Sequence, residues 1–411
     1  MDRRKFLTLT GATALATTGA ALLGETASER LAGAATKRKP LGPPRPVTLG
    51  FIALTDCASL VMAQELGYFA ERNLDVTLQK QASWPATRDA LLTGQLDGAH
   101  CLFSMPFSVA TGIGGKGSTA LKIAMTLSNN GQAITLNDSY SSVGYDHLKA
   151  AGKALGNKPT TLAMTFPGGT HDTWLRYWLK ATKAPTANIN IIPVPPPQMV
   201  ANMKVGTMDG YCVGEPWNAA AVAQGIGFTT LTTQDLWLNH PEKALVVTEQ
   251  FATGKQAVLE DVMAAVLKAS KWLDNFSNRS KAAAILSAPG YVNTPIANIL
   301  PRLEGHYDLG AGLPPKTYHG NQMVFYRNGA VNFPRRAYAI WFMAQYQRFG
   351  LLKAAPNYTK LADEIILTDL YRKVAAKEGI AVPDDDMASF EVLLDHTTFN
   401  PNHPEKEVKR A

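Results

Sequence analysis

Two loops of the sequence combine an aromatic or imidazole side chain with turn residues, and both follow predicted strands. Trp84 lies in the loop just before a helix, because Pro85 is suited to the first helical position. His171 ends the segment 167–171, with the sequence PGGTH, which directly follows the apolar strand 160–166. A Gly-Gly loop lets backbone N–H groups approach a ligand closely, and the start of the next helix adds a partial positive charge. These positions predict a site for a small anion, against the alternatives of a core tryptophan and a surface histidine in an ordinary turn.

The sequence contains no pattern typical of a hydrolase, a nucleotide site or a metal site. H-E-x-x-H, G-x-S-x-G and Walker motifs do not occur. A G-x-G-x-x-G pattern at 112–117 precedes the strand 121–127 instead of leaving a strand, so we interpret it as a flexible loop. His100 and Cys101 are neighbours on a strand and point to opposite faces, which excludes a nucleophile-base pair. We predict no catalytic residue, no metal and no cofactor, and we favour binding over catalysis.

The elements that must position this site belong to a chain with an internal repeat. Residues 94–101 have the sequence GQLDGAHC, and residues 206–217 have the sequence GTMDGYCVGEPW. In both copies a helical apolar run ends at a glycine, an Asp-Gly turn follows, and a short apolar strand leads into a loop. We expect two similar α/β lobes whose loops face each other across a cleft, where open α/β sheets bind ligands.

Apolar runs mark the strands of these lobes, and the region after residue 251 is mostly helical by its apolar 3-4 spacing. We assign residues 45–135 and 247–397 to lobe I and residues 136–246 to lobe II. The segment 398–411 is polar and is predicted to be a frayed tail. The predicted strands are 47–54, 74–78, 99–103, 121–127, 160–166, 189–194, 228–231 and 244–248.

Composition is that of a soluble globular protein, and the first residues of the sequence resemble an export signal. The 411 residues are 46% hydrophobic and 18% charged, and the net charge of +7 comes without a dense Lys/Arg run, which argues against nucleic acid binding. Residues 1–34 resemble a twin-arginine signal: Arg3 and Arg4 precede the apolar stretch 7–24, and an A-x-A cleavage site ends at residue 34. We therefore expect a periplasmic protein.

The three cysteines leave two states open. An odd count without Cys-x-x-Cys spacing indicates neither a disulfide framework nor a zinc site. Cys57 and Cys101 are the better candidates for a single pair, because both would follow strands of the same lobe. Buried free thiols are the alternative, and this alternative includes Cys212.

Five segments, in this order along the chain, resemble a known family. They are residues 55–56, 83–89, 167–171, 213–217 and 239–243. With them, the chain resembles the solute-binding proteins of nitrate and bicarbonate ABC transporters from about residue 47 to at least residue 346. The resemblance implies a two-lobed type II periplasmic binding fold that closes on its ligand like a hinged clamp, acts as a monomer and has an ABC permease and ATPase as partners.

The resemblance also implies the ligand contacts. The family's nitrate contacts fall on five residues of this sequence: Trp84, Gln132, His171, Gly214 and Lys243. In the bicarbonate-binding relatives an acidic residue replaces the lysine and brings a calcium ion, so Lys243 favours nitrate. Nitrate has three acceptor oxygens and no proton to give, and a pocket that offers donors only satisfies it. Bicarbonate carries an O–H that needs an acceptor, for which Glu215 is the candidate, and Lys243 as a solvated surface charge is the alternative.

The resulting hypothesis is a periplasmic receptor that captures nitrate, and nitrite as well, for import by an ABC transporter. Bicarbonate or a small organic anion such as a sulfonate is the second hypothesis. The third is an enzyme of the thiamin pyrimidine synthase group, which shares the fold, but the cysteine-rich loop of that group is missing. The family's cyanobacterial members are lipid-anchored, whereas no cysteine follows the signal of this chain, which implies a freely diffusing receptor.

Overall fold

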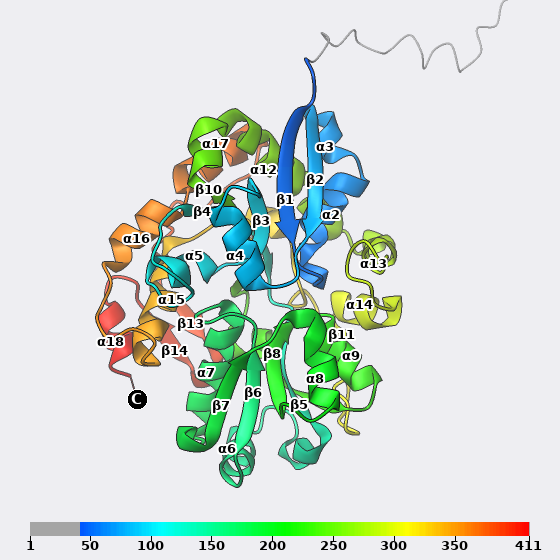
Figure 1. The fold of residues 1–411 in the computed structure, drawn as a ribbon, viewed down its shortest axis with the longest axis vertical. Coiled ribbons are helices and arrows are strands. Elements are labelled where there is room, and N and C mark those ends of the chain that lie inside the picture. The colour runs from blue at the N-terminus through cyan, green and yellow to red at the C-terminus, as the bar shows by residue number, and fades with distance from the viewer. Residues whose placement is uncertain (1–41, 411) are drawn as a thin grey trace, which may run out of the picture. The chain divides into compact units, whose positions relative to one another are not determined.

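Two five-stranded sheets organise the chain (Figure 1). The computed structural model describes residues 42–410, and residues 44–411 form one structural unit. The first sheet has the order β2-β1-β3-β10-β4 and the second has the order β7-β6-β8-β5-β9. β10 runs antiparallel to both of its neighbours in the first sheet, and β5 does the same in the second. The predicted α/β fold is confirmed; both sheets are mixed, and β10 joins the first sheet from beyond the second one in the chain. The predicted signal at residues 1–34 lies outside the described residues.

The strands and helices have the following bounds. The first sheet consists of β1 (Arg45–Phe51), β2 (Leu74–Lys80), β3 (Gly98–Leu102), β4 (Leu121–Asn129) and β10 (Pro241–Thr248). The second consists of β5 (Gln132–Asn137), β6 (Thr160–Met164), β7 (Ile189–Pro193), β8 (Gly210–Gly214) and β9 (Gly227–Thr232). Two short hairpins pair β11 (His306–Tyr307) with β12 (Lys316–Thr317) and β13 (Phe390–Val392) with β14 (Thr397–Phe399). The α-helices are α2 (Ala58–Glu65), α3 (Tyr68–Glu71), α4 (Trp84–Leu92), α5 (Met105–Ala110), α6 (Leu148–Gly156), α7 (Thr170–Thr182), α8 (Met199–Lys204), α9 (Trp217–Ala223), α10 (Thr233–Leu236), α11 (Glu249–Gly254), α12 (Gln256–Leu273), α13 (Arg279–Leu286), α14 (Ile296–Leu303), α15 (Arg336–Arg348), α16 (Tyr358–Ile365), α17 (Thr368–Lys377) and α18 (Pro404–Val408).

The internal repeat places an aspartate in the same role in both sheets. Asp97 comes just before β3, and its carboxylate accepts a hydrogen bond of 2.8 Å from the backbone N–H of Thr48 in β1. Asp209 comes just before β8, and its carboxylate accepts a bond of 2.9 Å from the N–H of Thr161 in β6. Each aspartate thus satisfies a backbone donor of the neighbouring parallel strand. The repeat detected in the sequence therefore corresponds to equivalent positions in the two sheets.

The chain passes between the sheets at residues 130–131 and again between β9 and β10. Asn130 and Gly131 both have left-handed backbone angles, with φ values of 62° and 84°. The side-chain amide of Asn130 connects the two crossing segments. Its oxygen accepts a hydrogen bond from the backbone N–H of Asn239 at 2.8 Å, and its nitrogen donates to the backbone oxygen of Gln322 at 3.2 Å. A third segment reaches the second sheet near Leu309, whose oxygen accepts from a backbone N–H of β9. The crossings between the sheets thus lie just before β5 and just before β10, whereas the proposed lobe divisions at 135/136 and 246/247 fall inside these two strands.

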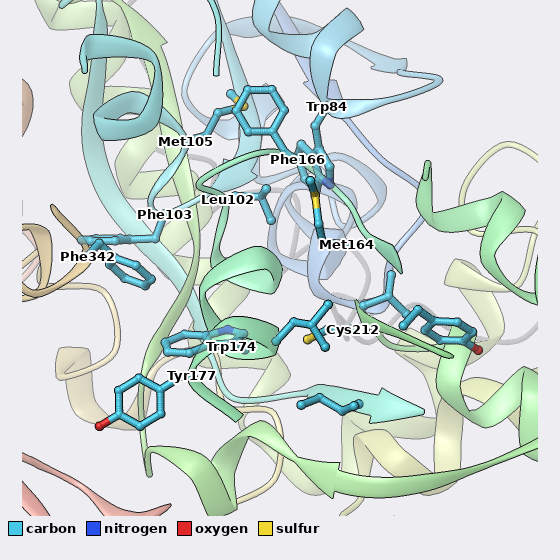
Figure 2. Packing of buried hydrophobic residues seen from close by; sticks show 14 of the residues in the cluster. Trp84, Leu102, Phe103, Met105, Met164, Phe166, Trp174, Tyr177, Cys212 and Phe342 are labelled. Atoms are coloured by element: carbon cyan, nitrogen blue, oxygen red, sulfur yellow. The ribbon is translucent and has the colours of Figure 1, made fainter. Parts of the chain in front are cut away.

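A shared apolar core continues from one sheet to the other. Figure 2 shows Leu102 of β3 together with Met164 of β6 and Cys212 of β8, which belong to one buried cluster. Helix α15 adds aromatic side chains to this cluster, and the ring of Phe342 lies 5.4 Å from that of Trp174 in α7. These aromatic contacts lie next to the buried polar site, because Trp174 also donates a hydrogen bond to Glu242.

Two expectations for the rest of the chain are settled by packing. The predicted frayed tail is wrong, because β14 pairs with β13 and Phe399 is buried. In α18, Glu407 is also buried and contacts Arg410.

All three cysteines are buried free thiols, so the alternative of free thiols holds and the pairing of Cys57 with Cys101 is excluded. None of the helices described between residues 42 and 410 combines the length and the hydropathy that a membrane span requires.

Candidate functional site

Lys243 is the centre of a buried charged group between the two sheets. It lies near the start of β10, opposite Leu102 of β3, and its side chain is fully buried. Its Nζ lies 2.8 Å from Asp56 Oδ2 and 2.9 Å from Glu242 Oε1, and both carboxylates are fully buried as well. The alternative of a solvated surface lysine is therefore wrong. Asp56 reaches this position because the chain turns directly after β1, in the short 3-10 helix Thr55–Cys57.

Gln132 and His171 close this group into a ring of polar contacts. Gln132, the first residue of β5, donates from Nε2 to Asp56 Oδ2 at 3.1 Å. Its Oε1 lies 2.9 Å from His171 Nε2, and that nitrogen lies 3.2 Å from Glu242 Oε1. The other ring nitrogen of His171 lies 2.7 Å from Thr165 Oγ1. Gln132 and His171, both predicted from the sequence, therefore link the two carboxylates that flank Lys243.

Trp84 and Gly214 complete the predicted set. Trp84 begins α4 after the N-cap Ser83, and the Lys243 ammonium lies 5.9 Å from the centre of its ring. Its indole Nε1 is buried and has no hydrogen-bond partner among the described residues. Gly214 ends β8, and a Cβ there would lie 2.5 Å from Gln132 Oε1. The five predicted residues thus lie together, with Gly214 needed for the close approach of Gln132.

Sequence reasoning missed several residues that shape this site. Glu242 accepts hydrogen bonds from Thr170 Oγ1 at 2.6 Å and from Trp174 Nε1 at 2.9 Å. His240 packs on the ring of Trp174 with the ring centres 4.6 Å apart. His100 of β3 lies 2.7 Å from Asp56 Oδ1. Asp56 carries the same signal as Trp84, a polar or aromatic group directly after a strand, and could have been found by it; the burial of Glu242 has no comparable local signal.

The charges of the group stabilise one another. Burial would raise the pKa of Asp56, but Lys243 and His100 hold that pKa at about 2. Burial would also raise the pKa of Glu242, and Lys243 together with His171 holds it well below the usual value. The two carboxylates in turn keep the pKa of Lys243 above its usual value despite burial. Both carboxylates and the ammonium are therefore ionised at neutral pH.

Burial has the dominant effect on the three imidazoles of the group and lowers their pKa values. Burial lowers the pKa of His171 and of His100 below the ordinary value, although nearby carboxylates oppose this change. Burial also lowers the pKa of His240, to about 4. The three imidazoles are therefore neutral at pH 7, and the group carries one net negative charge.

Two expectations about the chemistry of the site need correction. The pocket does not offer donors only, because Asp56 and Glu242 place two acceptor carboxylates beside the ammonium. The Gly-Gly loop is not an open anion seat either, since Gly168 N donates to Asp172 Oδ2 at 2.8 Å and Gly169 N donates to Phe166 O. A carboxylate of the chain itself takes the position that the sequence suggested for a ligand.

Glu215 has a structural partner instead of an open position. Its carboxylate lies 2.7 Å from Arg302 NH1, and both side chains are almost fully buried. Arg302 also donates to the backbone oxygen of Asp308 at 2.8 Å. Asp56 and Glu242, which lie nearest to the ammonium, are therefore better candidates than Glu215 for accepting a hydrogen bond from the O–H of a ligand.

The arrangement leaves a polar donor without a partner close to the ammonium. Trp84 supplies a buried N–H donor, and Lys243 has three N–H donors of which two face carboxylates. Among the described residues no group of three or more histidine, cysteine, aspartate or glutamate side chains has the geometry to hold a metal ion. The site thus combines one ammonium, neutral donors and two acceptors in a place shielded from water.

Comparison with known proteins shows where such a site occurs. A model of the NMT1-like family matches residues 41–287. The chain belongs to the NMT1-like family. It is 35% identical to the nitrate/nitrite binding protein NrtA of Nostoc sp. over 433 aligned positions, which cover 99% of this chain and 97% of that protein. It is also 34% identical to the nitrate import ATP-binding protein NrtC of Synechocystis sp., covering 88% of this chain and 54% of that protein.

A solved structure agrees with this assignment. The crystal structure of the periplasmic nitrate-binding protein NrtA from Synechocystis has a TM-score of 0.85 and 34% identity, covering 89% of this chain and 98% of that one. The resemblance to nitrate-binding proteins and the periplasmic binding fold, both expected from the sequence, are confirmed for this NMT1-like chain.

Proposed function

We propose that this protein is a periplasmic receptor that binds nitrate, and nitrite as well, and delivers the ion to an ABC permease and its ATPase. The observation that carries the proposal is the buried Trp84 Nε1, a donor without a partner beside the Lys243 ammonium. An anion that accepts from both groups satisfies an otherwise costly buried donor. The similarity to NrtA over nearly the whole chain and to NrtC over half of that ATP-binding protein supports the substrate and the partners.

The proposed contacts are the five residues inferred from the sequence. Trp84 and Lys243 donate directly, and Gln132 and His171 reorient their amide and imidazole toward the ion when it enters between the sheets. Gly214 leaves room for Gln132. The ion stabilises the closed arrangement of the lobes, and the permease recognises that arrangement. Export through the signal at residues 1–34, a monomeric state and the absence of catalysis belong to the same proposal.

Calorimetry with four ligands tests the substrate. Nitrate and nitrite are expected to bind with one ion per chain, whereas bicarbonate, with and without calcium, and methanesulfonate bind far more weakly. Nitrate recovered unchanged after prolonged incubation supports a receptor without turnover. Bicarbonate binding in the presence of calcium, with no heat from nitrate, contradicts the proposal and favours the second hypothesis.

A matched pair of variants tests the site. Trp84→Phe keeps an aromatic side chain, though a smaller one, and removes the N–H, so nitrate affinity is expected to fall about tenfold or more, the usual value of a hydrogen bond to a charged group. Trp272→Phe in α12 is the control, because Trp272 is partly exposed and lies outside the buried ring of contacts. Equal affinities for the two variants would remove Trp84 from the site.

A further inference from the structure

His100 is a buried imidazole whose second nitrogen is not used by the fold. Its Nε2 lies 2.7 Å from Asp56 Oδ1, and its side chain is fully buried. Asp56 is ionised and can only accept, so Nε2 carries the proton and Nδ1 is left with a lone pair. That Nδ1 has no hydrogen-bond partner among the described residues. The fold therefore fixes the orientation of this ring through one nitrogen only.

The second nitrogen belongs to the same site as Trp84. The rings of His100 and Trp84 lie 5.7 Å apart between their centres, with an angle of 43° between their planes. Trp84 Nε1 is the other buried nitrogen of this pair without a partner. Two unpartnered nitrogens on adjacent buried rings indicate a shared ligand more strongly than either does alone.

The charge of the site decides what His100 must do when an anion enters. Asp56 and Glu242 outweigh the single ammonium of Lys243, so the group has one net negative charge while the imidazoles are neutral. A second negative charge in a place without water is costly unless a positive charge comes with it. A proton bound at Nδ1 of His100 supplies that charge and creates an N–H donor where the anion needs one.

The other imidazoles are less suited to this role. His171 already has a partner at each ring nitrogen, Thr165 on one side and Gln132 with Glu242 on the other. His240 likewise has Thr233 Oγ1 at 2.8 Å from Nε2 and Pro241 O at 3.4 Å from Nδ1. A proton on His100 differs because it gains a hydrogen bond only when the ligand is present.

We propose that His100 contacts the bound anion through Nδ1 and takes up one proton when nitrate binds. The inference rests on the proposed function and adds a determinant of specificity. With its proton, Nδ1 donates to an anion that only accepts. Without it, the lone pair of Nδ1 accepts the O–H of an anion such as bicarbonate, so the preference for nitrate over a hydroxyl-bearing anion falls as the pH rises.

The groups that face His100 agree with a proton that arrives with the ligand. Burial lowers the pKa of His100 below 6.5, Asp56 and Glu242 raise it, and Lys243 lowers it. The imidazole is therefore neutral at pH 7.5 before binding. An anion beside Nδ1 adds a further raising effect, and proton uptake then accompanies binding.

Nitrate calorimetry at pH 7.5 in buffers of different ionisation enthalpy counts the protons in the unaltered protein. We expect about one proton taken up per nitrate and an increase of the nitrate Kd by about tenfold per pH unit between pH 7.5 and 9. His100→Gln, which keeps a donor for Asp56, is expected to bind nitrate with almost no proton uptake and a flat pH profile. His403→Gln is the control, because the His403 side chain is 52% exposed and lies outside the site, and it keeps the proton uptake.

Three outcomes decide the matter. Nitrate binding by the unaltered protein without proton uptake overturns the inference but leaves the proposed function intact. Proton uptake that persists in His100→Gln, or that disappears in His403→Gln, also overturns it; His100→Asn serves if the glutamine variant does not fold. A complete lack of nitrate binding by the unaltered protein refutes the proposed function itself and the inference with it.

Discussion

The buried ammonium of Lys243 is the part of the site whose removal has the most definite consequences. Lys243→Met keeps the length and apolar stem of the side chain but removes its charge. Asp56 and Glu242, which lie 2.8 and 2.9 Å from that charge, remain in a place without solvent. The variant therefore leaves two carboxylates that have lost their largest source of opposite charge.

The expected loss follows from the burial of the three groups. Removing one partner of a fully buried ion pair costs about 3–5 kcal/mol, because the remaining charge is left uncompensated. Lys268→Met is the matched control. Its ion pair with Glu71 has both side chains about half exposed, at 48% and 50%, and such a pair contributes less than about 1 kcal/mol.

Urea unfolding, followed by tryptophan fluorescence, measures both variants against the unaltered protein at pH 7 and pH 5. In the unaltered protein the lowered pKa of Asp56, about 2, gives stability that is present above its ordinary pKa of 3.8 and is lost as the pH falls toward 2. In Lys243→Met the pKa values of Asp56 and Glu242 rise instead. Protonation then relieves the variant, so its deficit is largest at pH 7 and shrinks toward pH 5.

Nitrate provides a second readout of the same change. At 100 times its Kd, nitrate is expected to stabilise the unaltered protein by about 2.7 kcal/mol and Lys243→Met not at all. Adding Asp56→Asn to Lys243→Met recovers part of the lost stability, because one unpaired charge disappears, but it does not restore nitrate binding. A stability of Lys243→Met within about 1 kcal/mol of the unaltered protein at pH 7, or a deficit equal at both pH values, refutes this account of the buried charges.

Three further predictions concern close packing, the end of the chain and the thiols. Gly214→Ala places a Cβ 2.5 Å from Gln132 Oε1 and is expected to lower nitrate affinity about tenfold in calorimetry, whereas Gly254→Ala, where no atom lies within 4 Å of the new Cβ, leaves it unchanged. Deletion of residues 398–411 removes the buried Phe399 and is expected to cost at least about 2 kcal/mol in urea unfolding, and full stability of the shortened chain contradicts its packing. The three cysteines are buried, which raises their pKa values, so they should not react with a thiol reagent at pH 8 until urea unfolds the protein, and fast reaction of any of them contradicts this burial.

The sequence by itself determined most of the elements that position the site, but it missed β5, which begins at Gln132. Alternation, apolar runs and glycine-terminated helices act over a few residues, so they predict most of the strands and the helix starts that carry Trp84 and His171. The repeat predicted two equivalent sheets, and Asp97 and Asp209 have the same role in them. The five predicted site residues lie together because each of them stands at or near a strand end.

Only the tertiary structure decided the electrostatics of the site. Asp56 and Lys243 are separated by 187 positions in the chain, and no local pattern shows that they meet in a buried pair with Glu242. Whether a carboxylate accepts from the chain or from a ligand depends on which donors packing brings to it. For that reason Asp172 occupies the expected anion seat, and Glu215 pairs with Arg302.

Tertiary packing also decided whether the last residues are ordered against the rest of the chain. Residues 398–411 are polar and end the chain, which locally favours fraying, but Phe399 and Glu407 find partners on β13 and α15 that lie close in space. Local patterns report the intrinsic preference of a segment, whereas burial and ionisation depend on the surroundings that the whole fold provides. The sequence therefore located the site, and the fold set its charge.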